Sequence, residues 1–254
     1  ASANVGTFDQ SNPDIRYKPA PTQSEVAEAE RQYAEVEAKY KGTAGWLKAP
    51  NGKPTNLNER QWVQVRTPLF KAWFGDWEHD PKNASKVVDE NGEPMVLYNG
   101  RKTLTTKYPV KTKGYVSNNF LGSWEVERNG AFFTDNKEYA RQYGEHINPV
   151  FLNIRWLGEH SEQQQNDFTE TLSPFEERDL WLSAKNINQA WKLLDGEIGD
   201  RFVSYLKNDA MYDGYVFQED IVLDDFSNLE SNTYVVFSPN QIKSATANVG
   251  TFSE

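Results

Sequence analysis

The sequence predicts an α+β fold in which the short strands of an antiparallel sheet follow an N-terminal helical arm. Apolar residues recur at helical spacing between residues 23 and 41, whereas short β-branched and aromatic runs, separated by turn residues, begin near residue 85. The chain has 254 residues, which is long enough to bury a core without disulfides. Short strands with interspersed helices favour this class over a doubly wound parallel sheet.

The helical arm is expected over residues 22–80. Its helices have local start and stop signals: residues 23–41 after the Thr22-x-x-Glu25 capping box and before Gly42, a stretch from Asn58 through Val65, and a helix begun by Thr67-Pro68 and stopped by Gly75. The last helix and the residues just after it carry large apolar side chains at close spacing, namely Leu69, Phe70, Trp73, Phe74 and Trp77. We interpret this face as a packing surface.

The strand-rich domain is expected over residues 81–254. Its predicted elements are a hairpin over 86–98 that turns at Asp89–Gly92, a strand over 131–134, a helix capped by Asp135 or Asn136 and closed by Gly144, strands over 150–154, 214–217, 221–223 and 233–237, and a helical region over 184–209 interrupted at Gly196 and Gly199. Two polar stretches, residues 101–129 and 158–180, are expected to be irregular, and the first is long enough to be a functional loop.

The two ends of the chain are nearly identical in sequence. Residues 1–8 read ASANVGTF and residues 245–252 read ATANVGTF, so seven of eight positions match. The repeat predicts that the chain is one unit of a tandem array, with residues 1–21 as the tail of a preceding unit and a linker. In the alternative interpretation, both copies mark cleavage junctions in a larger polypeptide.

The composition excludes several kinds of chemistry. The chain has 27 Lys and Arg against 37 Asp and Glu, for a formal net charge of −10, so we expect no bulk nucleic-acid binding. It contains no cysteine and three histidines, so we expect no thiolate chemistry and no metal site. No apolar window approaches the roughly 18 residues of a membrane span, so we expect no membrane partner. Aromatic residues make up 13%, which indicates extensive burial or stacking.

Three segments are candidates for a binding site. They are the strand end Tyr98-Asn99-Gly100-Arg101, the strand-cap-helix segment from Gly130 through Thr134 and Asp135 to Tyr143, and the strand-turn segment from Tyr234 to Lys243. Gly100 would let a backbone approach a ligand closely, and Arg101 could bind a phosphate bidentately, although a solvated loop arginine is an equal alternative. Each segment alone is common in α+β folds.

Together, these segments resemble the ADP-ribosyltransferase-like domain of phage and mobile-element polyvalent proteins. Such domains read Tyr-His-Gly-Thr, then Gly-x-Tyr-Phe-Thr-Asp, then Pro-x-Gln-Ile-Lys-Ser-Ala. The matching positions are Tyr98 and Gly100, then Gly130 and Phe133 to Asp135, then Pro239 to Ala245. The second segment is also similar to the poly-ADP-ribose polymerase and diphtheria-toxin class, with Tyr143 as its helix aromatic. The resemblance covers residues 57–254 and, as the tail of a preceding unit, residues 1–17.

The resemblance implies a split antiparallel sheet around a cleft for NAD⁺, which is the co-substrate. Nicotinamide would stack between Phe132 or Phe133 and Tyr143, because aromatic faces attract a flat cationic ring. Its amide would bond the Gly100 backbone. Tyr98, Arg101 and Thr134 would complete the cofactor contacts. The reaction would displace nicotinamide from the ribose through an oxocarbenium-like state.

Three positions depart from the family pattern. Asn99 stands where the family has a ribose-binding His, Phe132 where it has Tyr, and Ala140 where Ser often bonds the nicotinamide amide. Gln241 agrees with the Gln of the polyvalent subgroup but stands where the best-known transferases have Glu. Asn99, Phe132 and Gln241 are the expected catalytic set, with Asn99 and Gln241 lining one cleft. Gln241 cannot supply a negative charge, and the loss of one such electrostatic partner costs about 10²–10³ in rate.

Three functions remain open. The first is a mono-ADP-ribosyltransferase, or an NAD glycohydrolase, that modifies a host macromolecule, expected to be a protein, in the host cytoplasm after delivery with a virion or mobile element. The second is a degenerate module that binds a nucleotide or a protein partner. The third is a structural domain that contacts neighbouring units of a larger polypeptide. A small nuclease is a further rival, but the acidic charge and few histidines count against it.

Overall fold

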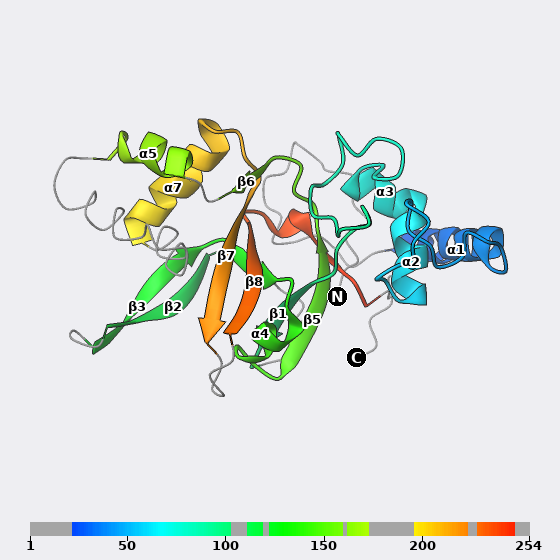
Figure 1. Cartoon of the computed structure of the whole chain (residues 1–254), viewed down its shortest axis with the longest axis horizontal. Coiled ribbons are helices and arrows are strands. Elements are labelled where there is room, and N and C mark those ends of the chain that lie inside the picture. Colours follow the sequence, from blue (N-terminus) through cyan, green and yellow to red (C-terminus); the bar gives the residue numbers. More distant parts are fainter. Residues whose placement is uncertain are drawn as a thin grey trace. The chain divides into compact units, whose positions relative to one another are not determined.

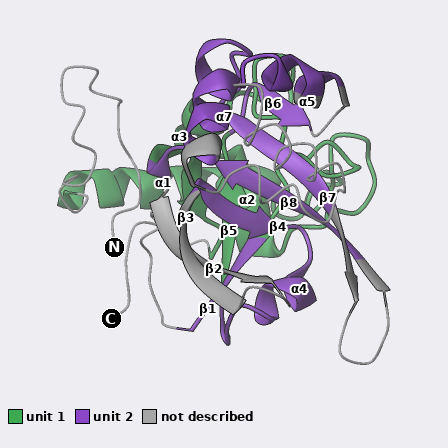
Figure 2. Cartoon of the chain, turned by 90° about the vertical axis from the view of Figure 1, so that its left-hand side faces the viewer, with its two compact units in different colours: residues 1–97, 148–153, 240–254 green, residues 98–147, 154–239 purple. Residues whose placement is uncertain are grey.

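The computed structural model describes residues 22–102, 111–118, 122–159, 162–172, 196–222 and 228–246 (Figure 1). The chain divides into two compact units (Figure 2). Unit 1 consists of residues 1–97, 148–153 and 240–254, and unit 2 consists of residues 98–147 and 154–239. The predicted domain boundaries after residues 21 and 80 stay predictions. The first copy of the repeat, residues 1–8, lies outside the described residues. So does the second copy, residues 245–252, except for Ala245 and Thr246.

The helices of unit 1 begin and end at the expected signals. They are α1 (Gln23–Tyr40), α2 (Glu59–Arg66) and α3 (Pro68–Phe74). Thr22 and Glu25 form both halves of the capping box at α1, and Asn58 and Gln61 do the same at α2. Gly75 ends α3 at φ 103°, where a Cβ would lie 2.4 Å from Ala84 Cα. The prediction of a helical arm is therefore confirmed.

The core of unit 1 combines these helices with segments from later in the chain. Part of β5 (His146–Leu152) pairs antiparallel with β9 (Ile242–Ser244). The buried cluster consists of Val36, Leu57, Trp62, Val63, Val65, Phe70, Phe74, Trp77, Ala84, Phe151 and Ala245. Phe70 packs edge-on against Phe151 with ring centroids 5.1 Å apart, so the apolar face of α3 is a packing surface as expected.

Unit 2 contains a mostly antiparallel sheet with two helices packed on it. Its strands follow the order β6 (Leu157–Glu159), β7 (Gly214–Val222), β8 (Asn228–Val236), β4 (Ala131–Thr134) and β1 (Leu97–Arg101), and the β6–β7 pair is parallel. Helices α5 (Glu162–Thr169) and α7 (Gly196–Asn208) contribute Phe168, Phe202 and Leu206 to one cluster with Tyr215, Phe217 and Val235 (Figure 1). The predicted α+β class is confirmed.

The stretch 101–129 differs from the prediction of an irregular loop. It contains an antiparallel hairpin of β2 (Lys111–Asn118) and β3 (Gly122–Asn129), paired from Lys111 opposite Asn129 to Asn118 opposite Gly122. Polar side chains dominate both strands, so the apolar alternation that marks a half-buried strand is weak here. Eight consecutive main-chain pairs make the hairpin despite that composition.

Three smaller expectations also change. The hairpin over 86–98 is reduced to a single bridge between Val88 and Pro94. The Asp89 side chain accepts the main-chain N–H groups of Asn91 and Glu93 through Oδ1. In addition, Pro94 has no N–H group to donate to a strand ladder. The predicted strands 214–217 and 221–223 are one strand, β7, paired along nine positions with β8. Part of the polar stretch 158–180 is helix α5.

Gly199 does not interrupt the helical region, because it lies in the first turn of α7, which begins at Gly196. The predicted interruption at Gly196 stays a prediction. Phe202 and Leu206 are 1% and 0% exposed, and burying this apolar face outweighs the cost of a glycine in the first turn. Residues 184–195 lie outside the described residues.

Candidate functional site

The first two candidate segments meet in one corner of unit 2. This corner, called the β1–β4–α4 corner below, consists of residues 98–101 of β1, strand β4, and helix α4 (Lys137–Arg141) with the turn that follows it. β1 and β4 are antiparallel, with Tyr98 opposite Thr134. The sequence places these segments more than 30 residues apart, and strand pairing brings them together.

The start of α4 is fixed by side-chain caps. Asn136 Oδ1 accepts from the main-chain N–H groups of Glu138 (3.0 Å) and Tyr139 (3.2 Å), as an N-cap does. The Thr134 hydroxyl accepts from Asn136 N (3.0 Å) and bonds the Ser231 hydroxyl. Thr134 is only 5% exposed, so its side chain positions the helix, and its contact with a cofactor stays a prediction.

Asp135 ties the same turn to β8. Its carboxylate accepts from Ser231 Oγ (3.1 Å), Asn232 N (3.0 Å) and Asn232 Nδ2 (2.7 Å). These bonds hold the half-buried carboxylate against β8. Asp135 is therefore a structural acceptor, although it belongs to the motif that carries the family resemblance.

The end of α4 lies directly on β1. A Cβ at Gly100 would lie 1.7 Å from the carbonyl oxygen of Ala140, and a Cβ at Gly144 would lie 2.1 Å from Arg101 C. Real Cβ atoms do not approach other atoms so closely, so both positions require glycine. In the structure, the backbone of α4 takes the space that a side chain at position 100 would need. The expectation that the Gly100 backbone approaches a ligand closely stays a prediction.

Asn99 is held at both ends of its amide. Its Nδ2 donates to the Phe132 carbonyl oxygen (2.8 Å), and its Oδ1 accepts from Arg101 Nε (2.6 Å). A carbonyl can only accept and a guanidinium can only donate, so these two partners fix which amide atom is oxygen. Asn99 thereby links β4 to the side chain of Arg101.

The aromatic residues of the corner differ strongly in exposure. Phe133 is 1% exposed, whereas Phe132, its neighbour on the opposite face of β4, is half-buried against the unit 2 cluster. Tyr143 is 52% exposed, and its hydroxyl bonds that of Tyr139 at 2.5 Å. The Tyr139 and Tyr143 rings meet edge-on with centroids 5.3 Å apart. Tyr143 therefore presents a ring that is accessible and held in place.

Eight of the nine predicted site residues belong to unit 2 and lie on or next to this corner. They are Tyr98, Asn99, Gly100, Arg101, Phe132, Phe133, Thr134 and Tyr143. Gln241 belongs to unit 1, in the 3₁₀ turn η3 (Pro239–Gln241), where its Nε2 donates to Asn153 O at 3.1 Å. The role of Gln241 in the site stays a prediction.

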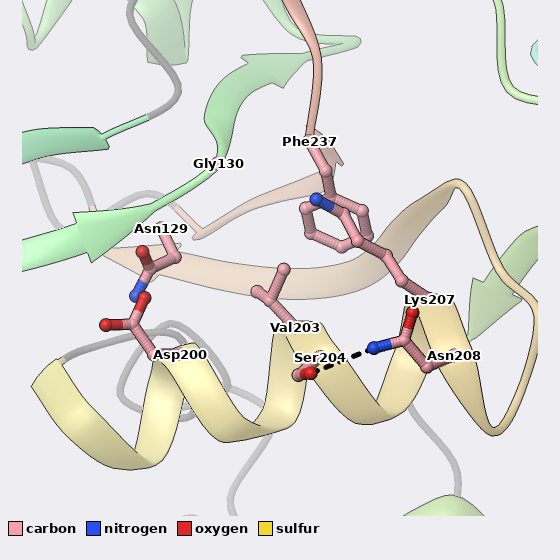
Figure 3. A pocket seen from close by; sticks show the side chains of 8 residues that line it. All are labelled: Asn129, Gly130, Asp200, Val203, Ser204, Lys207, Asn208 and Phe237. Carbon is pink, nitrogen blue, oxygen red and sulfur yellow. Dashed lines mark hydrogen bonds between the residues drawn. The ribbon is translucent and has the colours of Figure 1, made fainter. Parts of the chain in front are cut away.

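A shallow pocket at the other end of β4 was not expected from the sequence (Figure 3). Its volume is about 250 Å³, and its lining residues are Asn129, Gly130, Asp200, Val203, Ser204, Lys207, Asn208 and Phe237. The Lys207 ammonium lies 5.2 Å from the Phe237 ring centroid, and burial lowers the pKa of Lys207. Most of the lining comes from successive turns of α7. These residues lie within the predicted helical region, but the sequence does not indicate that Asn129, Gly130 and Phe237 lie beside them.

One group of potential metal ligands occurs among the described residues. Ligand atoms of Asp76, Glu78 and His79 lie within 4.8 Å of one another. The Lys71 ammonium bonds both carboxylates, at 3.0 Å to Asp76 Oδ1 and closer to Glu78. Arg66 Nε also lies 3.3 Å from Glu78 Oε1. Two fixed cations therefore already pair with these carboxylates, so the cluster is an ion-pair network of unit 1.

The comparison with protein families decides the assignment. The model of the family described as ADP-ribosyltransferase in polyvalent proteins, ART-PolyVal, matches residues 89–252. The chain belongs to this family. The match spans well over half of the 254 residues and includes every predicted site residue. No curated protein and no solved structure gave a significant match.

Membership of the ART-PolyVal family indicates ADP-ribosyltransferase activity, for which NAD⁺ is the co-substrate. Family membership also accounts for two features that occur together in the β1–β4–α4 corner. One is the glycine in strand β1, and the other is the strand-cap-helix segment formed by β4 and α4. Among the described residues, no helix is both long enough and apolar enough to cross a bilayer.

Proposed function

We propose that the protein is an NAD⁺-dependent mono-ADP-ribosyltransferase, or an NAD glycohydrolase, that acts on a host macromolecule after delivery by a phage or mobile element. Family membership over residues 89–252 is the observation that carries this proposal. The β1–β4–α4 corner supports it, because an accessible aromatic ring, Tyr143, adjoins a strand that bears Asn99 and Arg101.

In this proposal the corner binds NAD⁺ through stacking and polar contacts. The exposed ring of Tyr143 receives the nicotinamide, with Phe132 as the second aromatic contact, and attraction between a cationic ring and an aromatic face contributes about 1–2 kcal/mol when desolvated. Arg101 binds phosphate, since a guanidinium fork matches phosphate oxygens. Gln241 is proposed as the polar partner of the ribose, and the acceptor is proposed to be a protein.

A degenerate, binding-only module is the second candidate, and the charges of the corner favour it. Asn99 and Phe132 are neutral, and the carboxylate of Asp135 is already occupied by Ser231 and Asn232. An oxocarbenium-like state is normally stabilised by a carboxylate. Nicotinamide cleavage would therefore be slow, while nucleotide binding would persist.

Calorimetric titration with NAD⁺ tests the shared part of both candidates. The full chain is titrated alongside Arg101→Ala. A second variant, Arg31→Ala, is the control in place of Arg141→Ala, which alters the corner itself. Arg31 is an exposed arginine of unit 1 that pairs with Glu28 and Glu35. We expect Arg101→Ala to weaken NAD⁺ binding and Arg31→Ala to leave it unchanged. Absence of NAD⁺ binding by the unaltered chain would overturn both candidates and leave a structural role.

A further inference from the structure

The amide of Asn99 has a geometry that points to a role through Arg101. The Phe132 carbonyl oxygen receives one Nδ2–H, and the Nε–H of Arg101 is donated to Oδ1 at 2.6 Å. The first bond anchors Asn99 to the main chain of β4, which is part of the sheet. The second bond ties the Nε–H end of the Arg101 guanidinium to that anchored amide.

We propose that Asn99 is a positioning residue: it orients the Arg101 guanidinium for binding the diphosphate of the nucleotide. This inference rests on the proposed function, because it assigns one part of NAD⁺ to one part of the corner. An anchored Nε–H fixes the plane of the guanidinium, and its terminal nitrogens are the part that binds phosphate bidentately. Asn99 thus acts through Arg101 rather than on the ribose.

The surroundings of Arg101 support a phosphate ligand. The Arg101 backbone lies against Gly144, which directly follows the exposed ring of Tyr143. A nucleotide whose base stacks on Tyr143 therefore extends toward the first strand, where Arg101 lies. The chain has a net charge of −10, so an arginine that is held by Asn99 beside an accessible ring is a local positive charge that attracts an anion.

A double-mutant cycle distinguishes positioning from direct contact. Affinity for ADP-ribose is measured for the full chain and for Asn99→Ala, Arg101→Ala and the double variant. Positioning predicts that Asn99→Ala weakens binding about tenfold, the scale of one hydrogen bond to a charged group. In the Arg101→Ala background, the same change should alter affinity less than about twofold, because coupled residues are not additive. Equal losses in both backgrounds would show that Asn99 contacts the ligand itself and would overturn the inference.

A second measurement tests the positioning without any ligand. Exchange of the Arg101 Nε–H with water is followed by NMR, with Arg141 Nε–H as the exposed reference. We expect Asn99→Ala to accelerate exchange at Arg101 and to leave Arg141 unchanged; unchanged exchange at Arg101 would overturn the inference. Adenosine, which lacks phosphate, should bind equally to the unaltered chain and Arg101→Ala, and a loss there would contradict the diphosphate assignment.

The outcomes separate this inference from the proposed function. ADP-ribose binding that depends on Arg101, without any release of nicotinamide from NAD⁺, would overturn the transferase activity and leave the inference standing. No ADP-ribose binding by the unaltered chain would overturn the diphosphate assignment.

Discussion

Gly100 of β1 lies against the main-chain carbonyl of Ala140 in α4, so closely that a Cβ on Gly100 would lie 1.7 Å from the Ala140 oxygen. This contact determines how near α4 and the turn that bears Tyr143 can come to the first strand. The glycine that the family resemblance places beside nicotinamide therefore also sets the geometry of the corner.

Replacement of Gly100 by alanine should disrupt the corner. The added methyl group must displace α4 from β1, and overpacking of this kind costs about 1–3 kcal/mol of unfolding free energy. We expect that loss in chemical denaturation, together with loss of NAD⁺ binding at temperatures where the variant stays folded. Gly45→Ala is the control, since the nearest atom to its new Cβ would be 3.7 Å away. Gly100→Ala with unaltered stability would contradict the packing described for α4.

Two substitutions of Tyr143 distinguish the role of its ring in NAD⁺ binding from the role of its hydroxyl. The side chain is 52% exposed, so Tyr143→Ala should change the unfolding free energy by less than about 1 kcal/mol. The same variant should lose most NAD⁺ affinity if the ring stacks on nicotinamide. Tyr143→Phe keeps the ring, loses the bond to Tyr139, and should bind NAD⁺ within about threefold of the unaltered chain, the scale of a single neutral hydrogen bond. Equal NAD⁺ affinity for Tyr143→Ala would exclude the stacking role.

Unit 1 depends on a buried ion pair. Arg66 NH2 lies 2.8 Å from Glu93 Oε1, and the two side chains are 4% and 0% exposed. The Arg66 guanidinium also stacks 3.7 Å from the Trp62 ring centroid. Glu93→Gln leaves the buried Arg66 charge with Glu78, 3.3 Å from Arg66 Nε, as its carboxylate partner. We therefore expect a cost of about 3 kcal/mol, the low end for a broken buried pair, in denaturation followed by tryptophan fluorescence.

The control for this ion pair is an exposed arginine of the same unit. Arg31 is 55% exposed and pairs with Glu28 and Glu35 on the surface of α1. Arg31→Ala should cost less than about 1 kcal/mol, as exposed pairs do. Similar losses of unfolding free energy for Arg31→Ala and Glu93→Gln would show that burial does not make the Arg66–Glu93 pair more important for stability than an exposed pair.

Tyr234 makes the stability of unit 2 depend on pH in the alkaline range. Burial, with a smaller effect of the Asp135 charge, raises the pKa of Tyr234 from 10.0 to about 12. Unfolding then releases a proton between pH 10 and 12, so the stabilisation is complete below pH 10 and is lost as pH rises to about 12. The unfolding free energy should fall more steeply than in Tyr234→Phe, by about 1.4 kcal/mol per pH unit. Urea titrations at several alkaline pH values measure both slopes, and parallel slopes would contradict the burial of the hydroxyl.

The sequence predicts those parts of the fold that depend on local signals. The caps at Thr22, Asn58 and Thr67 and the stop at Gly75 lie within a few residues of the helix ends that they determine, and α1, α2 and α3 begin and end there. The β2–β3 hairpin depends instead on main-chain pairing between polar strands, and composition carries little information about that pairing.

The residues of the candidate site are predictable as segments but not as contacts. A resemblance in three short motifs is enough to select Asn99, Gly100 and Tyr143. The bond from Asn99 to Phe132 O and the contact of Gly100 with Ala140 join residues more than 30 positions apart. Such contacts depend on strand register, which a single sequence does not specify. The two hydrogen bonds of the Asn99 amide could therefore be recognised only in the structure.

Release of nicotinamide from NAD⁺ is the most direct test of the central claim. The full chain is incubated with NAD⁺ labelled in the nicotinamide ring, with and without host lysate, and free nicotinamide is quantified. We expect release above the spontaneous rate, lower release by Arg101→Ala, and unaltered release by Arg31→Ala. No release by the unaltered chain under conditions where calorimetry detects bound NAD⁺ would contradict the transferase account and identify a binding module.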